Sequence, residues 1–381
     1  MQRRNLAVLC LALAGFAAML GLALANSKEW SVDFNQYYAA GKLAGTGHVY
    51  DWDAIRPLEL ERNAKAVPFG RFPVFAFAFK PLSALPYMFG RVIWLGIGIA
   101  ALAGFVALWP LSHRGWTCVA ICWSAPVALC LGFGQDSVLF LFFVTLGLRL
   151  LTGGRDFWAG IALSVCSSKP HLAVLLPVVL AATQKWKALL GGAVGGIVLM
   201  LVSFAVEGPE WPNRLLSLMR TPDFDPAANR MPNLRGLLSL VGGSRSAEIA
   251  LALVGVAVVW WLCRRLPLPS VFTLALAGGL LLGHHAYIYD ALLILPALMV
   301  RGEETYPEWL RKWALVLFTP VPYLFLLTDM YWIGHLAVTG YTVALMGVMV
   351  YRLRSATFSE TVTPGRDSIG DVGDSAPASA N

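Results

Sequence analysis

The sequence predicts an all-α polytopic membrane protein with about 12 transmembrane or re-entrant helices and two long outer loops. Of its 381 residues, 57% are hydrophobic and only 13% are charged, and the mean hydropathy of +0.65 is far above that of a soluble domain. The 14 Trp and 11 Tyr residues fit this class, because such rings favour the headgroup region of a bilayer. All six cysteines lie in apolar stretches without a C-x-x-C pair, so we expect neither disulfides nor a zinc site.

The first apolar segment favours an uncleaved span. Arg3 and Arg4 precede an apolar run of about 20 residues that ends at Ala25. Ala23-Leu24-Ala25 resembles the cleavage site of a secretory signal, but the run is longer than the roughly 7–15 residues of a signal core. Either alternative places residue 26 outside the cytoplasm.

Two long polar segments, residues 26–71 and 206–246, are predicted to form outer loops. The apolar stretch 72–86 is about 15 residues long and contains Lys80 and Pro81, so we expect it to be interfacial or re-entrant. The first outer region therefore extends to about residue 87.

The remaining apolar segments are predicted to cross the membrane. They lie at about 88–111, 117–132, 138–151, 188–205, 247–263, 270–283, 286–300, 313–328 and 334–350. Residues 1–354 then form one transmembrane domain with both ends in the cytoplasm, and the polar tail 355–381 is expected to be disordered there.

Residues 157–183 are ambiguous, because Ser167-Ser168-Lys169-Pro170-His171 interrupts them. Each half has about 12 residues, or roughly 18 Å of helix, against a hydrocarbon core of about 30 Å. The halves form either two short crossings that meet at a polar turn or one kinked span. Two crossings place the basic residues of the later short loops on the same side as Arg3, so the positive-inside rule favours two crossings.

This topology collects the unusual polar residues on the outer side of the membrane. Ionisable groups at membrane depth are costly, so they are candidates for function. These residues include Asp33, Asp51, Gln135, Asp136, Lys169, His171, Asn233, Arg235, His284, His285, Tyr289 and Asp290.

Several of these candidates also have a structural alternative. The residues that would serve as helix caps or turn residues are Asp33, Asp51, Gln135 and Asp136. His284 and His285 would serve as interfacial anchors, and Lys169 would extend its ammonium group to the headgroups. Lys169 and Pro170 lie between the two short apolar halves of residues 157–183. A lysine at such a turn has no routine structural use, which favours a functional role for Lys169.

Several short motifs, taken in order, resemble a known family. They are Asp33-Phe34-x-x-Tyr37-Tyr38-Ala39-Ala40-Gly41, Val49-Tyr50-Asp51, Phe72-Pro73, Lys80-Pro81-Leu82, Leu85-Pro86, Gly134-Gln135, Ala159-Gly160, Lys169-Pro170-His171, Met231-Pro232-Asn233-Leu234-Arg235-Gly236-Leu237-Leu238, and His285 with Tyr289-Asp290. The ordered set resembles glycosyltransferase family 87 of the GT-C superfamily, which includes polyprenyl-phosphate-mannose-dependent mannosyltransferases. No single motif is specific to it.

The resemblance implies roles for individual residues. Asp33 matches the family's catalytic acid in the first outer loop, and Lys169-Pro170, His285 and Tyr289-Asp290 match its later motifs. With these, the substrate-binding residues are expected to be Tyr37, Tyr38, Gln135, Lys169, His171, Asn233, Arg235, His284, His285, Tyr289 and Asp290. Asp136 departs from the family pattern, which often has Asn there, and its charge would disfavour a nearby phosphate unless it is paired.

The resemblance also implies a reaction. We expect a hexose, with mannose first among the alternatives, to pass from a polyprenyl-phosphate sugar to a lipid-linked or cell-envelope glycan acceptor at the outer face of the inner membrane. The implied mechanism is a single inverting displacement in which Asp33 accepts the proton of the acceptor hydroxyl. The lipid-linked donor is a co-substrate, and neither a cofactor nor a metal is expected.

A membrane transporter or lipid flippase with an outward-facing cavity is the alternative function. A transporter should have polar groups reachable from both faces, or broken helices in corresponding halves. The polar groups here lie on one side, which favours the enzyme. The net charge of +7 does not indicate a nucleic-acid partner, because the basic residues lie at membrane edges.

Overall fold

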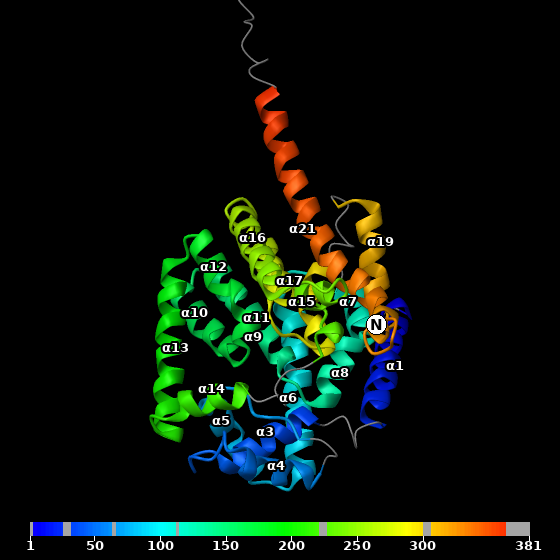
Figure 1. The fold of residues 1–381 in the computed structure, drawn as a ribbon. Helices are drawn as coiled ribbons and strands as arrows, with labels where there is room; N and C mark the ends of the chain where they lie inside the picture. The colour runs from blue at the N-terminus through cyan, green and yellow to red at the C-terminus, as the bar shows by residue number, and fades with distance from the viewer. Residues whose placement is uncertain are drawn as a thin grey trace, which may run out of the picture.

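The computed structural model describes residues 3–25, 32–62, 66–111, 114–220, 227–299 and 306–362, and within these ranges every regular element is a helix (Figure 1). The helices are α1 (Arg3–Ala25), α3 (Val32–Leu43), α4 (Trp52–Leu60), α5 (Pro73–Ser83), α6 (Tyr87–Leu108), α7 (Arg114–Cys122), α8 (Ala125–Phe133), α9 (Ser137–Thr152), α10 (Asp156–Ser164), α11 (Pro170–Ala173), α12 (Leu175–Ala182), α13 (Trp186–Glu207), α14 (Trp211–Met219), α15 (Leu234–Ser239), α16 (Arg245–Cys263), α17 (Leu268–Leu282), α18 (Leu295–Leu298), α19 (Glu308–Leu317), α20 (Val321–Phe325) and α21 (Tyr331–Val362). Short 3-10 helices are η1 (Val165–Ser168), η3 (Ala228–Arg230) and η4 (Ile288–Ile294). The predicted all-α class is confirmed.

Four helices in the described residues are long and apolar enough to cross a membrane, namely α6, α13, α16 and the Tyr331–Leu353 part of α21. The pair α8 and α9, bent by 113° at its break, would add a fifth if it is one span. The predicted count of about 12 crossings is therefore not confirmed. The reason is that many apolar stretches are short or interrupted, as at 286–300, where η4 and α18 replace one continuous helix.

The two long outer segments are not irregular loops. The first contains α3 and α4, the second contains α14, and these helices pack with α5 around one apolar cluster that includes Phe34, Ile55 and Trp211. They form a layer at the lower end of the molecule in Figure 1. The carboxylate of Asp51 accepts a hydrogen bond from the backbone N–H of Asp53 at 3.0 Å and caps α4, which confirms the cap interpretation for Asp51.

Helix α5 belongs to this layer. Its 11 residues span only about 16 Å, so it is too short to cross a bilayer. Helix α5 packs against α3 at Gly41, where an added Cβ would lie 2.1 Å from Ser83 Oγ. The ammonium of Lys80 donates to the carbonyl oxygen of Ala44 at 3.0 Å, which ties the end of α5 to the end of α3.

The interrupted segment 157–183 folds back on itself. Asp156 at the start of α10 pairs with Lys185, which follows α12, at 3.3 Å, so the segment enters and leaves at the same end. Helix α10 approaches α13 closely, because an added Cβ at Gly160 would lie 1.9 Å from the carbonyl oxygen of Ala188. The fold-back agrees with two segments that meet at a polar turn, and the crossing of the membrane by each segment stays a prediction.

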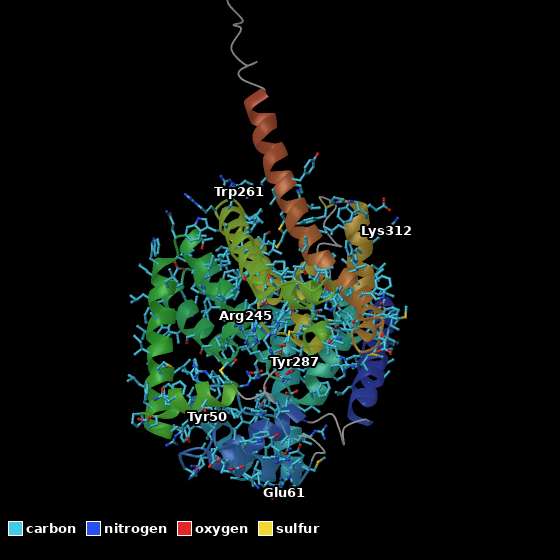
Figure 2. All side chains as sticks on the ribbon, viewed as in Figure 1. Tyr50, Glu61, Arg245, Trp261, Tyr287 and Lys312 are labelled. Carbon is cyan, nitrogen blue, oxygen red and sulfur yellow. The ribbon has the colours of Figure 1, made fainter. Side chains whose placement is uncertain are left out.

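Labelled residues mark the two ends of the molecule in Figure 2. Trp261 and Lys312 lie at the upper end in Figure 2, whereas Tyr50 and Glu61 lie in the helical layer at the lower end. Helix α21 projects from the upper end and continues to Val362, into the tail that was predicted to be disordered. The rest of that prediction, residues 363–381, lies outside the described residues.

Candidate active site

Three helix breaks meet beside the first turn of α3. They are the α8–α9 break, the η1–α11 junction and the start of η4. Gly134 ends α8 with a φ of 78°, and an added Cβ there would lie 2.6 Å from the Cβ of Phe34. This close approach fixes the first turn of α3, and with it Asp33, against the α8–α9 break.

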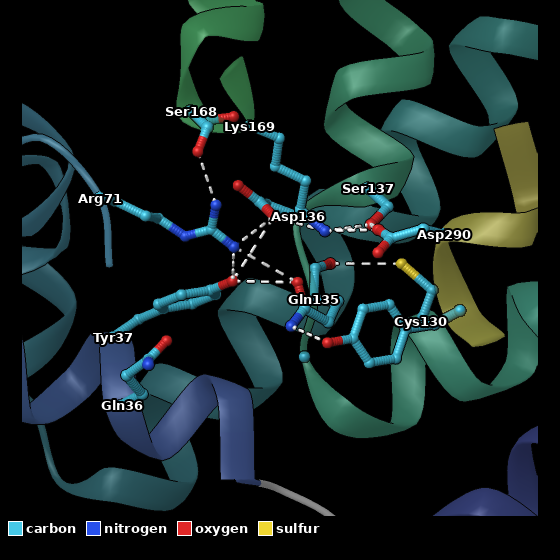
Figure 3. A network of polar contacts seen from close by, with 12 residues as sticks. Gln36, Tyr37, Arg71, Cys130, Gln135, Asp136, Ser137, Ser168, Lys169 and Asp290 are labelled. Carbon is cyan, nitrogen blue, oxygen red and sulfur yellow. Dashed lines mark hydrogen bonds and ion pairs between the residues drawn. The ribbon is translucent and has the colours of Figure 1, made fainter. Parts of the chain in front are cut away.

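A buried lysine connects the three breaks. The Lys169 ammonium donates to Asp290 Oδ1 and to Ser137 Oγ, each at 2.6 Å, and lies 3.6 Å from Asp136 Oδ1 (Figure 3). The second oxygen of Asp290 accepts the backbone N–H of Tyr287 at 2.9 Å. The Lys169 side chain is 4% exposed and that of Asp290 is 1% exposed, so this is a buried ion pair and not a lysine that reaches the headgroups.

Arg71 is the second cation of the site, and the sequence analysis did not select it. Its guanidinium donates to Asp136 Oδ1 at 2.9 Å, to the carbonyl oxygen of Ser168 at 2.7 Å and to the hydroxyl of Tyr37. One signal was available, since Arg71 directly precedes the Phe72-Pro73 motif. It was overlooked among the many basic residues of the first outer segment.

A chain of hydrogen bonds runs from α3 to η4. The hydroxyl of Tyr37 donates to Gln135 Oε1 at 3.1 Å, and Gln135 Nε2 donates to the hydroxyl of Tyr289 at 2.9 Å. Asp136 stands at the N-cap position of α9, but its side chain makes no capping hydrogen bond. The cap alternative for Asp136 is therefore wrong, and its charge is paired with Arg71 and Lys169.

Asp33 lies at the edge of this network as a partly buried residue. Loss of solvation raises the pKa of its carboxyl group to about 7, although the charges of Lys169 and Arg71 and a hydrogen bond with Gln135 act to lower it. Asp33 is thus ionised in part of the population at neutral pH. Ionised, it makes a third carboxylate beside two cations; protonated, it leaves Arg71 and Lys169 balanced by Asp136 and Asp290.

Aromatic contacts connect the network to two histidines. The rings of His171 and His285 lie 5.6 Å apart, His285 packs edge-on against Tyr287 at 4.7 Å, and Tyr287 lies 5.2 Å from Tyr289. Loss of solvation lowers the pKa of His285 to about 4, so this imidazole is neutral at pH 7.

The remaining predicted residues take other positions. Arg235 Nη1 lies 2.9 Å from His284 Nε2, and His284 Nδ1 lies 2.8 Å from Glu248 Oε1. Because arginine only donates, Nε2 of His284 accepts and its Nδ1–H donates to the carboxylate. Through His284, these groups adjoin His285 in the chain.

Asn233 and Tyr38 have structural partners. The side chain of Asn233 accepts the N–H of Gly236 at 2.9 Å and donates to the carbonyl oxygen of Gly283 at 2.7 Å, so it holds α15 against the segment that carries His284. The hydroxyl of Tyr38 donates to the carbonyl oxygen of Leu85 at 2.7 Å and is not part of the Tyr37 network. Within the described residues, no group of three or more His, Cys, Asp or Glu side chains is arranged to hold a metal ion.

Comparison with known proteins identifies a family. The model of glycosyltransferase family 87 matches residues 73–296, which is more than half of the chain. This stretch contains all three helix breaks, whereas Asp33, Tyr37 and Arg71 precede it. No curated protein and no solved structure matches the chain.

Proposed function

The chain belongs to glycosyltransferase family 87 and is a membrane glycosyltransferase, and we propose that it transfers a hexose, mannose first, from a polyprenyl-phosphate sugar to a lipid-linked or cell-envelope acceptor. A donor on an isoprenoid carrier suits an enzyme whose polar cluster lies among apolar helices. The family membership decides against the transporter alternative, although broken helices at a polar site are also a transporter feature.

Asp33 is the proposed general base, and its environment is the observation that carries the proposal. A useful base has a pKa near the working pH, and the Asp33 carboxyl group has a pKa of about 7. The acceptor oxygen forms a bond to the anomeric carbon while the bond from that carbon to the phosphate oxygen breaks. The proton of the acceptor hydroxyl passes to Asp33, and the electron pair leaves with the polyprenyl phosphate, so a single displacement inverts the anomeric centre.

The charges of the cluster suit this step. As the sugar leaves, negative charge develops on the phosphate. When Asp33 takes up its proton, the local carboxylates fall from three to two and balance Arg71 and Lys169. We propose that this change stabilises the leaving phosphate. Hydrogen-bond donors from Lys169, Arg235 and the two histidines His171 and His285 would stabilise it further.

The proposed orientation places this site at the outer face of the inner membrane. Lys312 and the turn Arg264-Arg265, which follows Trp261 at the end of α16, belong to the end that carries Trp261 in Figure 2, and the positive-inside rule assigns such a basic end to the cytoplasm. The helical layer with Tyr50 and Glu61 then lies outside, and the acceptor reaches Asp33 from that side.

The test uses purified protein in vesicles with radiolabelled polyprenyl-phosphate mannose and a lipid extract from a strain that lacks this chain. Wild-type protein should transfer label to one lipid or glycan species, and Asp33→Asn protein should not. Label transfer from a nucleotide sugar instead, or transport of the donor without any product, contradicts the proposal.

A further inference from the structure

A pocket with a largely apolar lining lies at the end of the molecule remote from the active site. It has a volume of about 810 Å³ and lies between the first turns of α19 and the last turns of the α21 span. Its lining residues are Tyr306, Pro307, Glu308, Trp309, Arg311, Ala344, Gly347, Val348, Tyr351 and Arg352. Lys312, which follows Arg311, lies in Figure 2 at the end opposite to Tyr50 and Glu61.

The composition of this pocket suits an anion at a membrane surface. Arg311 and Arg352 both line it, and the guanidinium of Arg352 lies 5.0 Å from the centre of the Tyr306 ring. Among the described lining residues, Glu308 is the one carboxylate beside these two arginines, and it pairs with Lys312 at 2.8 Å.

Arg311 carries a donor that lacks a partner. Its Nε is buried and makes no hydrogen bond to any described residue. Buried polar donors are normally satisfied, because an unpaired donor costs free energy. A phosphate oxygen is a suitable acceptor, since arginine binds phosphate through its planar array of N–H groups.

The position of the pocket favours a lipid over a soluble anion. Tyr351 and Arg352 stand at the end of the apolar Tyr331–Leu353 part of α21, which is long enough to span the bilayer, and the exposed Trp309 lines the same pocket. Aromatic side chains of this kind gather at the headgroup level. Ala344, Gly347 and Val348 give the pocket an apolar floor along the span, which would contact a glycerol backbone or the first methylenes of acyl chains.

We propose that this pocket binds the phosphate headgroup of an anionic phospholipid from the surrounding leaflet. The site is separate from the sugar-transfer reaction. Arg311 and Arg352 would bind the phosphate of the ligand, and the apolar floor would contact its lipid part.

The test is native mass spectrometry of the full chain with phosphatidylglycerol, and with phosphatidylcholine of the same acyl chains. Removal of both charges in Arg311→Gln/Arg352→Gln should weaken phosphatidylglycerol binding roughly 25-fold, at about a fivefold loss for each basic residue. The matched control is Arg264→Gln/Arg265→Gln, which removes two exposed arginines outside this pocket from the turn after α16. That control should bind almost as wild type does.

A steric variant keeps both charges. An added Cβ at Gly347 meets no atom within 4 Å, so Gly347→Leu should fold and place its side chain in the pocket. It should weaken phosphatidylglycerol binding about tenfold or more, with an unchanged thermal unfolding temperature.

Three outcomes overturn the proposal. The first is an equal loss of binding in the two double variants, because diffuse surface charge would then explain it. The second is equal binding of phosphatidylcholine and phosphatidylglycerol. The third is full displacement of the lipid by inorganic phosphate, which would make the site one for a free anion. Retained lipid binding in excess phosphate supports the lipid assignment.

Discussion

The ion pair between Lys169 and Asp290 is buried, so replacement of either residue alone should destabilise the protein. The two groups are 2.6 Å apart, and their side chains are 4% and 1% exposed. Removal of one partner from such a pair leaves a buried charge and costs about 3–5 kcal/mol. Lys169→Met and Asp290→Asn should therefore each lower the unfolding temperature clearly.

The double variant Lys169→Met/Asp290→Asn should be more stable than either single variant. It removes both charges, and Asp136 keeps its partner Arg71. Thermal unfolding of the four proteins in detergent gives the coupling free energy, which we expect to be about 2 kcal/mol or more. The control cycle is Lys185 with Asp156, a partly exposed pair at 3.3 Å, for which about 0–1 kcal/mol is expected.

The same variants separate a structural from a catalytic role of Lys169. If Lys169 acts on the donor phosphate, the double variant should be folded but should turn over about tenfold or more slowly than wild type. A stable Lys169→Met single variant, or a double variant no more stable than the singles, would refute the buried-pair argument. A folded double variant with wild-type turnover would refute the phosphate role.

Four further predictions concern neighbouring residues. Turnover should fall about tenfold per pH unit below pH 7, because the Asp33 carboxyl group has a pKa of about 7 and only its ionised form accepts a proton; a rate that is flat between pH 5 and 7 excludes this base. The folded state raises that pKa above its ordinary value, so ionised Asp33 lowers stability as the pH rises through 7, and Asp33→Asn should unfold at a higher temperature than wild type at pH 8. Arg71→Lys cannot make all three Arg71 contacts and should reduce turnover about tenfold or more. The exposed Arg56 on α4 is the control, because Arg56→Lys should leave turnover unchanged in the same steady-state assay. Gly134→Ala should destabilise the protein by at least about 1–2 kcal/mol, since Gly134 has a φ of 78° and faces Phe34; an unchanged unfolding temperature would contradict this.

The sequence predicted the helical class, the family and the longest spans, because these depend on local composition and ordered motifs. It did not predict the number of spans. An apolar stretch such as 117–132 is divided between α7 and α8, and apolarity alone does not show where a helix breaks. The folding of the outer segments was also missed, since α4 and α14 are short helices whose apolar cluster forms only when the two segments meet.

The candidate site was predicted in part. Tyr37, Gln135, Lys169, Tyr289 and Asp290 are brought together as the family motifs implied. The pairing of Lys169 with Asp290 was not foreseen, because the two residues lie 121 positions apart and no local pattern connects them. The role of Arg71 depends on the same long-range packing.

The most direct test of the proposed mechanism is the turnover of Asp33→Asn in vesicles with the lipid-linked donor. The amide keeps the shape of the side chain and loses its basic oxygen, so the rate should fall about 10²–10⁴-fold in folded protein. Glu61→Gln is the control, because it neutralises an exposed carboxylate in the same helical layer and should leave turnover unchanged. A decrease of less than about tenfold for Asp33→Asn would contradict the assignment of Asp33 as the base.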